Sequence, residues 1–460
     1  MQHFVKPEQY FAAANGIGGF SSLFSEVFSP IAYKRIYIIK GGPGSGKSTF
    51  LRRAADACTL RGIRTEKILC SSDPDSLDGL VLPEQKIALL DGTAPHAAEP
   101  SLPGAAETVL NFFDFFDCDG LHRHKSQLKA LSDEKRENYQ SAYRLLHALG
   151  QLHAQLDCVI SECFDLQKAQ GTVSRMLRRI APLGTQSGTI YLNANSTKGA
   201  VFLQSGAKPL VRVAPLHGAE ELLLDMFCDA LDAAGISAVR VADALNEKKT
   251  KALLFANGSI EIGTKAENAL CLNTARFLKS GITPAALRRK THALRSICNA
   301  ILQEVFSYLA KAGEAHAKIE ALCHPYINFG ALNDFTARFL RETLLPQCGR
   351  QEQPSLLRQL KFFPFLIDRF LRICYNESKC RNLTAKSKKC RPRTHSLQKK
   401  PCIPAAIYQR NGAARLCVIS SSSRTAWLII PALPLTIKHL WRPQRSRQWT
   451  RLPGILCAAA

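Results

Sequence analysis

The segment that most constrains this chain is IYIIKGGPGSGKSTFLRRAADACTLRG, which runs from Ile36 to Gly62. It fits the pattern G-x-x-x-x-G-K-[ST] without a mismatch, after a short apolar run and before a helical pattern. Glycines permit backbone conformations that a Cβ forbids, so successive N–H groups can turn inward around an anion. The order of strand, glycine-rich loop and helix therefore predicts a phosphate-binding loop.

The residue types in this loop suggest their roles. A helix that begins near Lys47 directs the positive end of its dipole at the same anion. We expect Lys47 to reach the β and γ phosphates of a nucleotide and the Ser48 hydroxyl to ligate Mg²⁺. The predicted nucleotide-binding residues are Gly41, Gly42, Pro43, Gly44, Ser45, Gly46, Lys47, Ser48 and Thr49.

A second motif, KIALLDGTAPH, places Asp91 at the end of an apolar run. This pattern predicts a strand that ends beside the loop, with a carboxylate that supports Mg²⁺, usually through water. Lys47 and Asp91 are thus the predicted catalytic residues. Gly92 follows, so the adjacent glutamate that activates water in many ATP-driven motors is missing. Thr93 or His96 could position water or a substrate instead, or form an ordinary polar loop.

Between these motifs, the segment SSDPDSLDG contains Asp73, Asp75 and Asp78 among turn-forming residues. Aspartate beside proline and serine favours turn chemistry. Asp73 remains a candidate for orienting Mg²⁺ or a substrate. No N-K-x-D signature of guanine recognition occurs in the sequence, so adenine is the expected base and ATP the expected nucleotide.

The chain also matches itself. YFAAANGIGGF at Tyr10 is echoed by YLNANSTKGAVF at Tyr191, and later matches follow in the same order with offsets that shrink from 180 to 163 residues. These matches predict a duplicated domain. Each copy is expected to end in a helical arm, because apolar residues recur at spacings of three and four between residues 122 and 180.

The second copy lacks the loop motif. Where the first copy reads GGPGSGKS, the second reads VAPLHGAEELL. At an offset of 173 residues, Ala219, Glu220 and Glu221 stand at the positions of Gly46, Lys47 and Ser48, and Ile262 stands where the first copy has Asp91. Carboxylates there would repel phosphate, and no lysine is available. We therefore expect a second domain of the same fold that binds no nucleotide.

The strings IIKGGPGSGKST, CSSDPDSLDG and IALLDGTAPH, in this order, resemble a bacterial family of tandem P-loop ATPases, also described as nucleotide-kinase-like. The resemblance extends more loosely over about residues 10–345. It implies that residues 41–49 bind ATP and that Asp91 supports Mg²⁺. The second half of this family generally carries a P-loop too, and the present sequence departs from it there.

Composition bears mainly on location and on the C-terminal region. The 16 cysteines include no C-x-x-C pair, and the N-terminus has no signal-peptide pattern, so a cytoplasmic protein that does not enter the membrane is expected. Residues 371–460 hold 18 of the 61 lysine and arginine residues but only one of the 37 acidic residues, so most of the net charge of +24 lies there. Such a segment favours an unstructured or out-of-frame tail. The alternative is a nucleic-acid-binding arm, the only part through which nucleic acid would bind.

These observations predict an α/β fold of the P-loop NTPase type, with a mostly parallel sheet flanked by helices, duplicated and carrying helical arms. The predicted domains are residues 1–187, a degenerate repeat at 188–345, and the basic tail at 346–460. The expected function is Mg-dependent ATP binding and hydrolysis. Two alternatives are a kinase for an unidentified small molecule or nucleotide acceptor, and a nucleotide-responsive binding module with little turnover that acts on a protein partner.

Overall fold

The structure is a computed structural model of the 460-residue chain that describes residues 5–95, 97–264, 268–348, 405–410, 413–418 and 426–430. It divides into two compact units, Met1–Pro354 and Ser355–Ala460. In the described part of the second unit, strands β17 (Ala405–Arg410), β18 (Ala413–Val418) and β19 (Ala426–Ile430) form an antiparallel sheet. The remainder of the predicted tail beyond residue 348 lies outside the described residues, so both interpretations of it stay predictions.

The first unit contains both of the segments that the sequence matches predicted as copies, here called the first half (up to residue 187) and the second half (residues 188–345). The first half contains β1 (Gln9–Phe11), β2 (Ala13–Gly16), β3 (Gly19–Ser22), α1 (Phe24–Val27), β4 (Arg35–Lys40), α2 (Lys47–Thr59), β5 (Glu66–Leu69), β6 (Leu77–Leu82), β7 (Ile87–Asp91), β8 (Glu107–Asn111), η1 (Phe112–Phe115), α3 (Cys118–His122), α4 (Lys125–Glu162) and α5 (Leu166–Ile180).

The second half has its helices and strands in a closely similar order. It contains β9 (Gly188–Tyr191), β10 (Asn193–Ser196), β11 (Gly199–Phe202), β12 (Pro209–Val213), α6 (Ala219–Ala233), β13 (Val239–Ala242), β14 (Thr250–Phe255), β15 (Gly258–Ile262), β16 (Leu270–Leu272), η2 (Thr274–Phe277), α7 (Pro284–Cys323), η3 (His324–Tyr326), α8 (Phe329–Arg338), η4 (Phe339–Leu344) and α9 (Leu345–Gln347).

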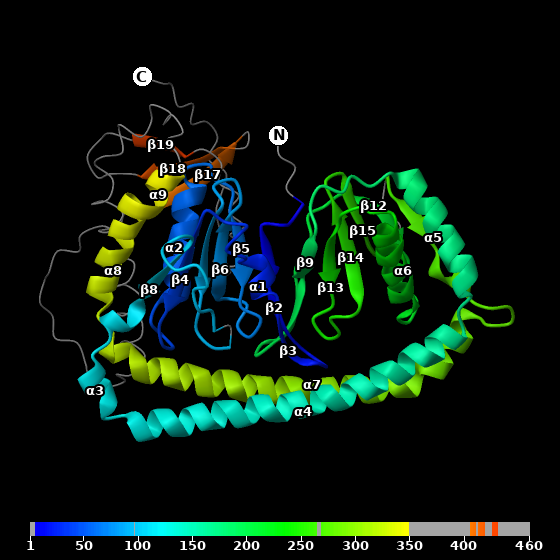
Figure 1. The fold of residues 1–460 in the computed structure, drawn as a ribbon, viewed down its shortest axis with the longest axis horizontal. Coiled ribbons are helices and arrows are strands. Elements are labelled where there is room, and N and C mark those ends of the chain that lie inside the picture. Colours follow the sequence, from blue (N-terminus) through cyan, green and yellow to red (C-terminus); the bar gives the residue numbers. More distant parts are fainter. Residues whose placement is uncertain are drawn as a thin grey trace, which may run out of the picture. The chain divides into compact units, whose positions relative to one another are not determined.

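One large, mostly parallel sheet runs through the first unit, with helices on its faces (Figure 1). Its described strands follow the order β16-β12-β15-β14-β13-β9-β1-β5-β6-β7-β4-β8, so the two halves have mirrored strand orders. In each half a single strand, β6 or β14, runs antiparallel to both of its neighbours. The halves meet where β1 pairs antiparallel with β9, with Phe11 opposite Tyr191.

The strands and the helix around the loop motif agree with the sequence pattern. β4, β5 and β7 lie at the segments predicted as strands, and β4 and β7 each bury four consecutive apolar residues. Helix α2 buries the predicted stripe, which consists of Phe50, Leu51, Ala54, Ala55 and Cys58. Removal of this apolar surface from water is the main force that holds the helix on the sheet.

The two long arm helices, α4 and α7, pack against each other along their lengths (Figure 1). Their shared core includes Leu146 and Leu149 of α4 and Val305 and Leu309 of α7. Each arm also carries the helix that follows it to the opposite half. Helix α5 packs in the core of the second half, beside α6, and α8 packs in the core of the first half. Each half therefore contributes a helix to the other.

In the parts of the chain that the structure describes, every helix is too short or too polar to cross a lipid bilayer.

Candidate functional site

The loop between β4 and α2 has the backbone conformation that its glycines allow. Gly44 has φ +73° and Gly46 has φ +82°, both in the left-handed region where other residues are strained. Gly46 is the N-cap residue of α2, so the N–H groups of the first helical turn are directed toward the loop. The predicted residues 41–49 thus form one continuous structure, from the end of strand β4 through the first turn of helix α2.

The two predicted catalytic residues lie next to each other at this edge of the sheet. β4 and β7 are parallel neighbours, and Ile39 is paired with Asp91. Lys47 Nζ lies 3.6 Å from Asp91 Oδ2, and the two side chains are only 12% and 18% exposed. Lys47 Nζ also donates hydrogen bonds to the carbonyl oxygens of Gly41 (2.8 Å) and Gly42 (2.9 Å). The ammonium group is therefore held inside the loop.

Thr93 fixes the orientation of Asp91. Its backbone N–H donates to Asp91 Oδ1 (2.9 Å), and its hydroxyl lies 2.5 Å from the same oxygen and 3.1 Å from the carbonyl oxygen of Gly41. Burial raises the pKa of Asp91, while Lys47 and the hydrogen bonds from Thr93 oppose that shift. Thr93 thus links the Asp91 carboxylate to the Gly41 carbonyl of the loop. The other predicted partner at this loop, His96, lies outside the described residues.

Asp78 belongs to the site, although the sequence pattern assigned it to a turn. That assignment is wrong, because Asp78 lies within β6 and is buried. The pairing of Gly79 with Leu90 places Asp78 opposite Asp91 on the adjacent strand, and its charge contributes to the raised pKa of Asp91. The sequence held one signal for this placement, namely the apolar run that follows Asp78. Such a run predicts a strand, and a strand can begin before its apolar residues.

The oxygen atoms at this edge suit Mg²⁺. Ser48 Oγ accepts a hydrogen bond from Leu77 N (2.9 Å), so the hydroxyl lies at the start of β6, beside Asp78. The described residues hold no group of three or more histidine, cysteine, aspartate or glutamate side chains arranged around a metal. In nucleotide sites Mg²⁺ is usually held by one or two carboxylates together with phosphates and water. Ser48, Asp91 and Asp78 fit that kind of site.

Asp73 lies apart from this group, in the turn that its sequence context favoured. Ser76 N donates to Asp73 O (2.8 Å), and the Ser76 hydroxyl donates to the Asp73 carboxylate (2.9 Å). Lys198, from the turn between β10 and β11 in the second half, lies 2.6 Å from both Asp73 and Asp75. Burial alone would raise the pKa of Asp73, but the bonds from Lys198 and Ser76 lower it below its ordinary value. Asp73 thus joins the two halves through an ion pair.

In the second half, the region between β12 and α6 has a backbone similar to that of the glycine loop between β4 and α2. Gly218 is the N-cap of α6 with φ +86°, as Gly46 is for α2. The body of the helix keeps the predicted offset of 173 residues, since Leu223, Leu224, Phe227 and Leu231 are buried like their counterparts. The cap glycine is offset by 172 instead, so Ala219, and not Glu220, follows the cap as Lys47 does.

The side chains at this second edge form ion pairs among themselves. A lysine is present after all, on a strand: Lys251 Nζ lies 2.7 Å from Glu221 and 3.4 Å from Asp243. Burial lowers the pKa of Lys251, but Asp243 and Glu221 outweigh this effect and raise it. Lys249 pairs with Asp157 at 3.1 Å. The expectation that no lysine is available was therefore wrong, although both lysines are neutralised by carboxylates.

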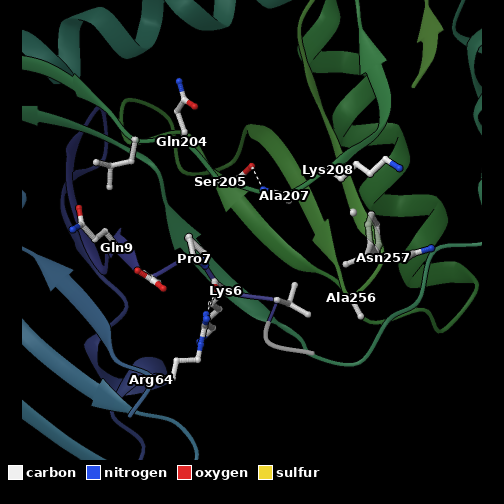
Figure 2. A pocket seen from close by; sticks show the side chains of 16 residues that line it. Lys6, Pro7, Gln9, Arg64, Gln204, Ser205, Ala207, Lys208, Ala256 and Asn257 are labelled. Atoms are coloured by element: carbon white, nitrogen blue, oxygen red, sulfur yellow. Dashed lines mark hydrogen bonds between the residues drawn. The ribbon is translucent and has the colours of Figure 1, made fainter. Parts of the chain in front are cut away.

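A cavity of about 640 Å³ lies away from the glycine loop, at the end of the sheet where most strands begin. It is lined from the first half by residues that include Lys6, Gln9 and Arg64, and from the second half by residues that include Ser205 and Asn257 (Figure 2). None of the predicted site residues lines it. Ligands of open α/β sheets bind beyond the carboxyl ends of the strands, where the loop lies. The cavity is therefore not the candidate nucleotide site.

Comparisons of the chain with models of protein families, with curated proteins and with solved structures gave no match, so the candidate site rests on sequence pattern and geometry.

Proposed function

We propose that the first half is a P-loop domain that binds ATP with Mg²⁺ and hydrolyses it, and that the second half arose by duplication and binds no nucleotide. One observation carries the proposal: Lys47 and Asp91 lie 3.6 Å apart beneath a glycine loop whose helix begins at Lys47. The loop amides and the ammonium group would bind the phosphates, while the carboxylate and the Ser48 hydroxyl would hold the metal ion.

Each residue has a defined task in this mechanism. Lys47 would exchange its bonds to the Gly41 and Gly42 carbonyls for bonds to phosphate oxygens, placing its charge where negative charge develops. Asp91, held in place by Thr93, would help to hold Mg²⁺ beside the phosphates. Mg²⁺ supplies further charge neutralisation when bound. Phe113, which is half exposed and close to Gly42, offers an aromatic face to a base.

The mirrored strand orders and the two left-handed cap glycines support the duplication. The ion pairs of Lys251 and Lys249 support the absence of nucleotide from the second half, because a phosphate chain would have to compete with carboxylates already in place.

Calorimetric titration of the whole chain with ATP and Mg²⁺ tests the proposal. We expect one equivalent of ATP per chain, release of phosphate, and loss of turnover when Mg²⁺ is chelated. Lys47→Ala should abolish turnover, whereas Arg52→Ala, at an exposed position on the same helix, should not change it. Turnover that survives Lys47→Ala, or two equivalents of ATP per chain, would contradict the proposal.

The same assay separates the alternatives. ADP formation that depends on an added acceptor would indicate a kinase, and tight binding without turnover would indicate a nucleotide-responsive binding module.

A further inference from the structure

The open side of the loop is contacted by the arm helix of the second half. Gly44 N donates a hydrogen bond to Glu320 Oε1 of α7 at 3.2 Å. The backbone of Glu320 lies against the same glycine, since a Cβ at Gly44 would be 3.4 Å from the Glu320 carbonyl oxygen. An amide of the kind expected to bind phosphate is thus occupied by a carboxylate from a residue 276 positions away.

Two basic side chains continue from this carboxylate. His316 Nε2, one helical turn before Glu320, lies 3.6 Å from Glu320 Oε1. His316 Nδ1 lies 3.0 Å from Lys135 Nζ of α4. Lys135, His316 and Glu320 therefore form a continuous row that begins on one arm helix, crosses to the other and ends at the loop.

The charges in this row favour an added anion. Burial lowers the pKa of His316, and the nearby charges of Lys135 and Lys47 lower it further, while the charges of Glu320 and Asp73 oppose that shift. Burial likewise lowers the pKa of Lys135, and Lys47 adds to that shift, while Cys70 and Glu320 oppose it. The positive charges of Lys135 and Lys47 thus both act on His316, which itself lies 3.0 Å from Lys135 Nζ, and a multiply charged anion among these groups would offset that repulsion.

We propose that the two arm helices complete the phosphate site: Lys135 and His316 bind the phosphate chain of the nucleotide, and Glu320 occupies the Gly44 amide until the nucleotide arrives. The inference rests on the proposed function of the loop. Phosphate carries more negative charge than a carboxylate and accepts the same N–H donors. The Glu320 side chain is 47% exposed, so it can turn away into solvent when phosphate takes its place.

The corresponding contact in the second half is an ion pair instead of a hydrogen bond to an amide. Asp157 of α4 stands at the sequence offset of 163 residues from Glu320 that the two arms share. It is held by Lys249 at 3.1 Å instead of by a loop amide. A hydrogen bond to a neutral amide is easier to exchange for phosphate than an ion pair with lysine is. Only the contact at Glu320 is therefore able to respond to nucleotide.

Because α7 begins in the second half and ends at the loop, this exchange would couple nucleotide binding to the position of the arm. A ligand can shift such an equilibrium only by its different affinity for the two states. Here the two states differ in affinity because the Glu320 carboxylate and the phosphate compete for the Gly44 amide.

Calorimetry of ATP binding with Mg²⁺ tests the proposal on four variants of the whole chain. Glu320→Gln removes the competing charge and should tighten binding roughly threefold or more. Lys135→Met removes a phosphate ligand and should weaken binding about tenfold. The matched controls are Glu314→Gln, an exposed position on α7, and Lys129→Met, an exposed position on α4, and both should bind ATP as the wild type does.

Amide hydrogen exchange over residues 314–323 supplies a second measurement that needs no turnover. Exchange in the wild type should rise when ATP binds, and Glu320→Gln should show the raised exchange before ATP is added. Unchanged or weaker affinity in Glu320→Gln, or unchanged affinity in Lys135→Met, would overturn the inference while ATP binding by the wild type leaves the proposed function intact. A wild type that binds no ATP would refute both.

Discussion

Each half has a loop edge, the region at the carboxyl ends of its strands where a glycine caps the next helix. The two loop edges have similar backbones, but their charged side chains are placed differently. In the first half the cation, Lys47, lies on the helix that follows the cap glycine, and a carboxylate, Asp78, lies on the reversed strand β6. In the second half these signs are exchanged: the helix carries Glu221, and Lys251 lies on β14 at the position that corresponds to Asp78. The two edges therefore differ in charge although their backbones are similar.

The exchange of charges has a physical consequence. Lys47 is bonded mainly to neutral carbonyl oxygens, which it can leave for a phosphate. Lys251 is within 3.4 Å of two carboxylates, and Lys249 within 3.7 Å of two others. Separating a partly buried ion pair leaves charges without partners, which is strongly unfavourable. The second edge is thus held together by internal ion pairs, whereas Lys47 at the first edge can exchange its carbonyl partners for the proposed phosphate.

The largest expected difference between the edges concerns catalysis. Asp91→Asn should lower turnover about 100-fold, because the substitution removes the carboxylate that supports the metal ion. Ile262→Val, at the corresponding end of β15, should leave turnover unchanged. Steady-state phosphate release at saturating ATP measures both. An equal loss in the two variants would mean that the edges are not functionally different.

A smaller effect is expected at the two cap glycines. Gly46→Ala and Gly218→Ala place a side chain in the left-handed region at φ +82° and +86°, and each should lower the free energy of unfolding by about 1–2 kcal/mol. Only Gly46→Ala should also weaken ATP binding. Chemical denaturation and calorimetry on the same preparations measure the two effects. Loss of ATP binding in Gly218→Ala would show that the second edge also takes part.

A further comparison concerns the fold of the second half alone. Lys251→Met leaves Glu221 and Asp243 close together without their shared cation, and should destabilise the protein by about 2 kcal/mol without changing its affinity for ATP. Lys47→Met should do the reverse, with little change in stability and no measurable ATP binding. Thermal unfolding with and without ATP distinguishes them, since only the Lys251 variant should still be stabilised by the nucleotide.

Part of the candidate site could be predicted from sequence because it depends on neighbouring residues. Glycine spacing gives the loop conformation, and an apolar run that ends in Asp91 gives a strand end. Asp78 was missed because turn-forming residues directly precede it, and a sequence window does not show where a strand begins. Lys251 was missed because it lies outside the loop motif, on strand β14 and 30 residues beyond Glu221.

By itself, the sequence determined the strand, loop and helix around Lys47, the long stripe of the arm and the loss of the lysine from the second loop, because local backbone preference and periodic burial decide these features. Only the tertiary structure decided that β1 meets β9, that α5 and α8 pack on opposite halves, and that Glu320 reaches Gly44. Such contacts join residues that are distant in the chain, up to the 276 positions between Gly44 and Glu320, and they depend on how whole surfaces pack, which no short pattern encodes.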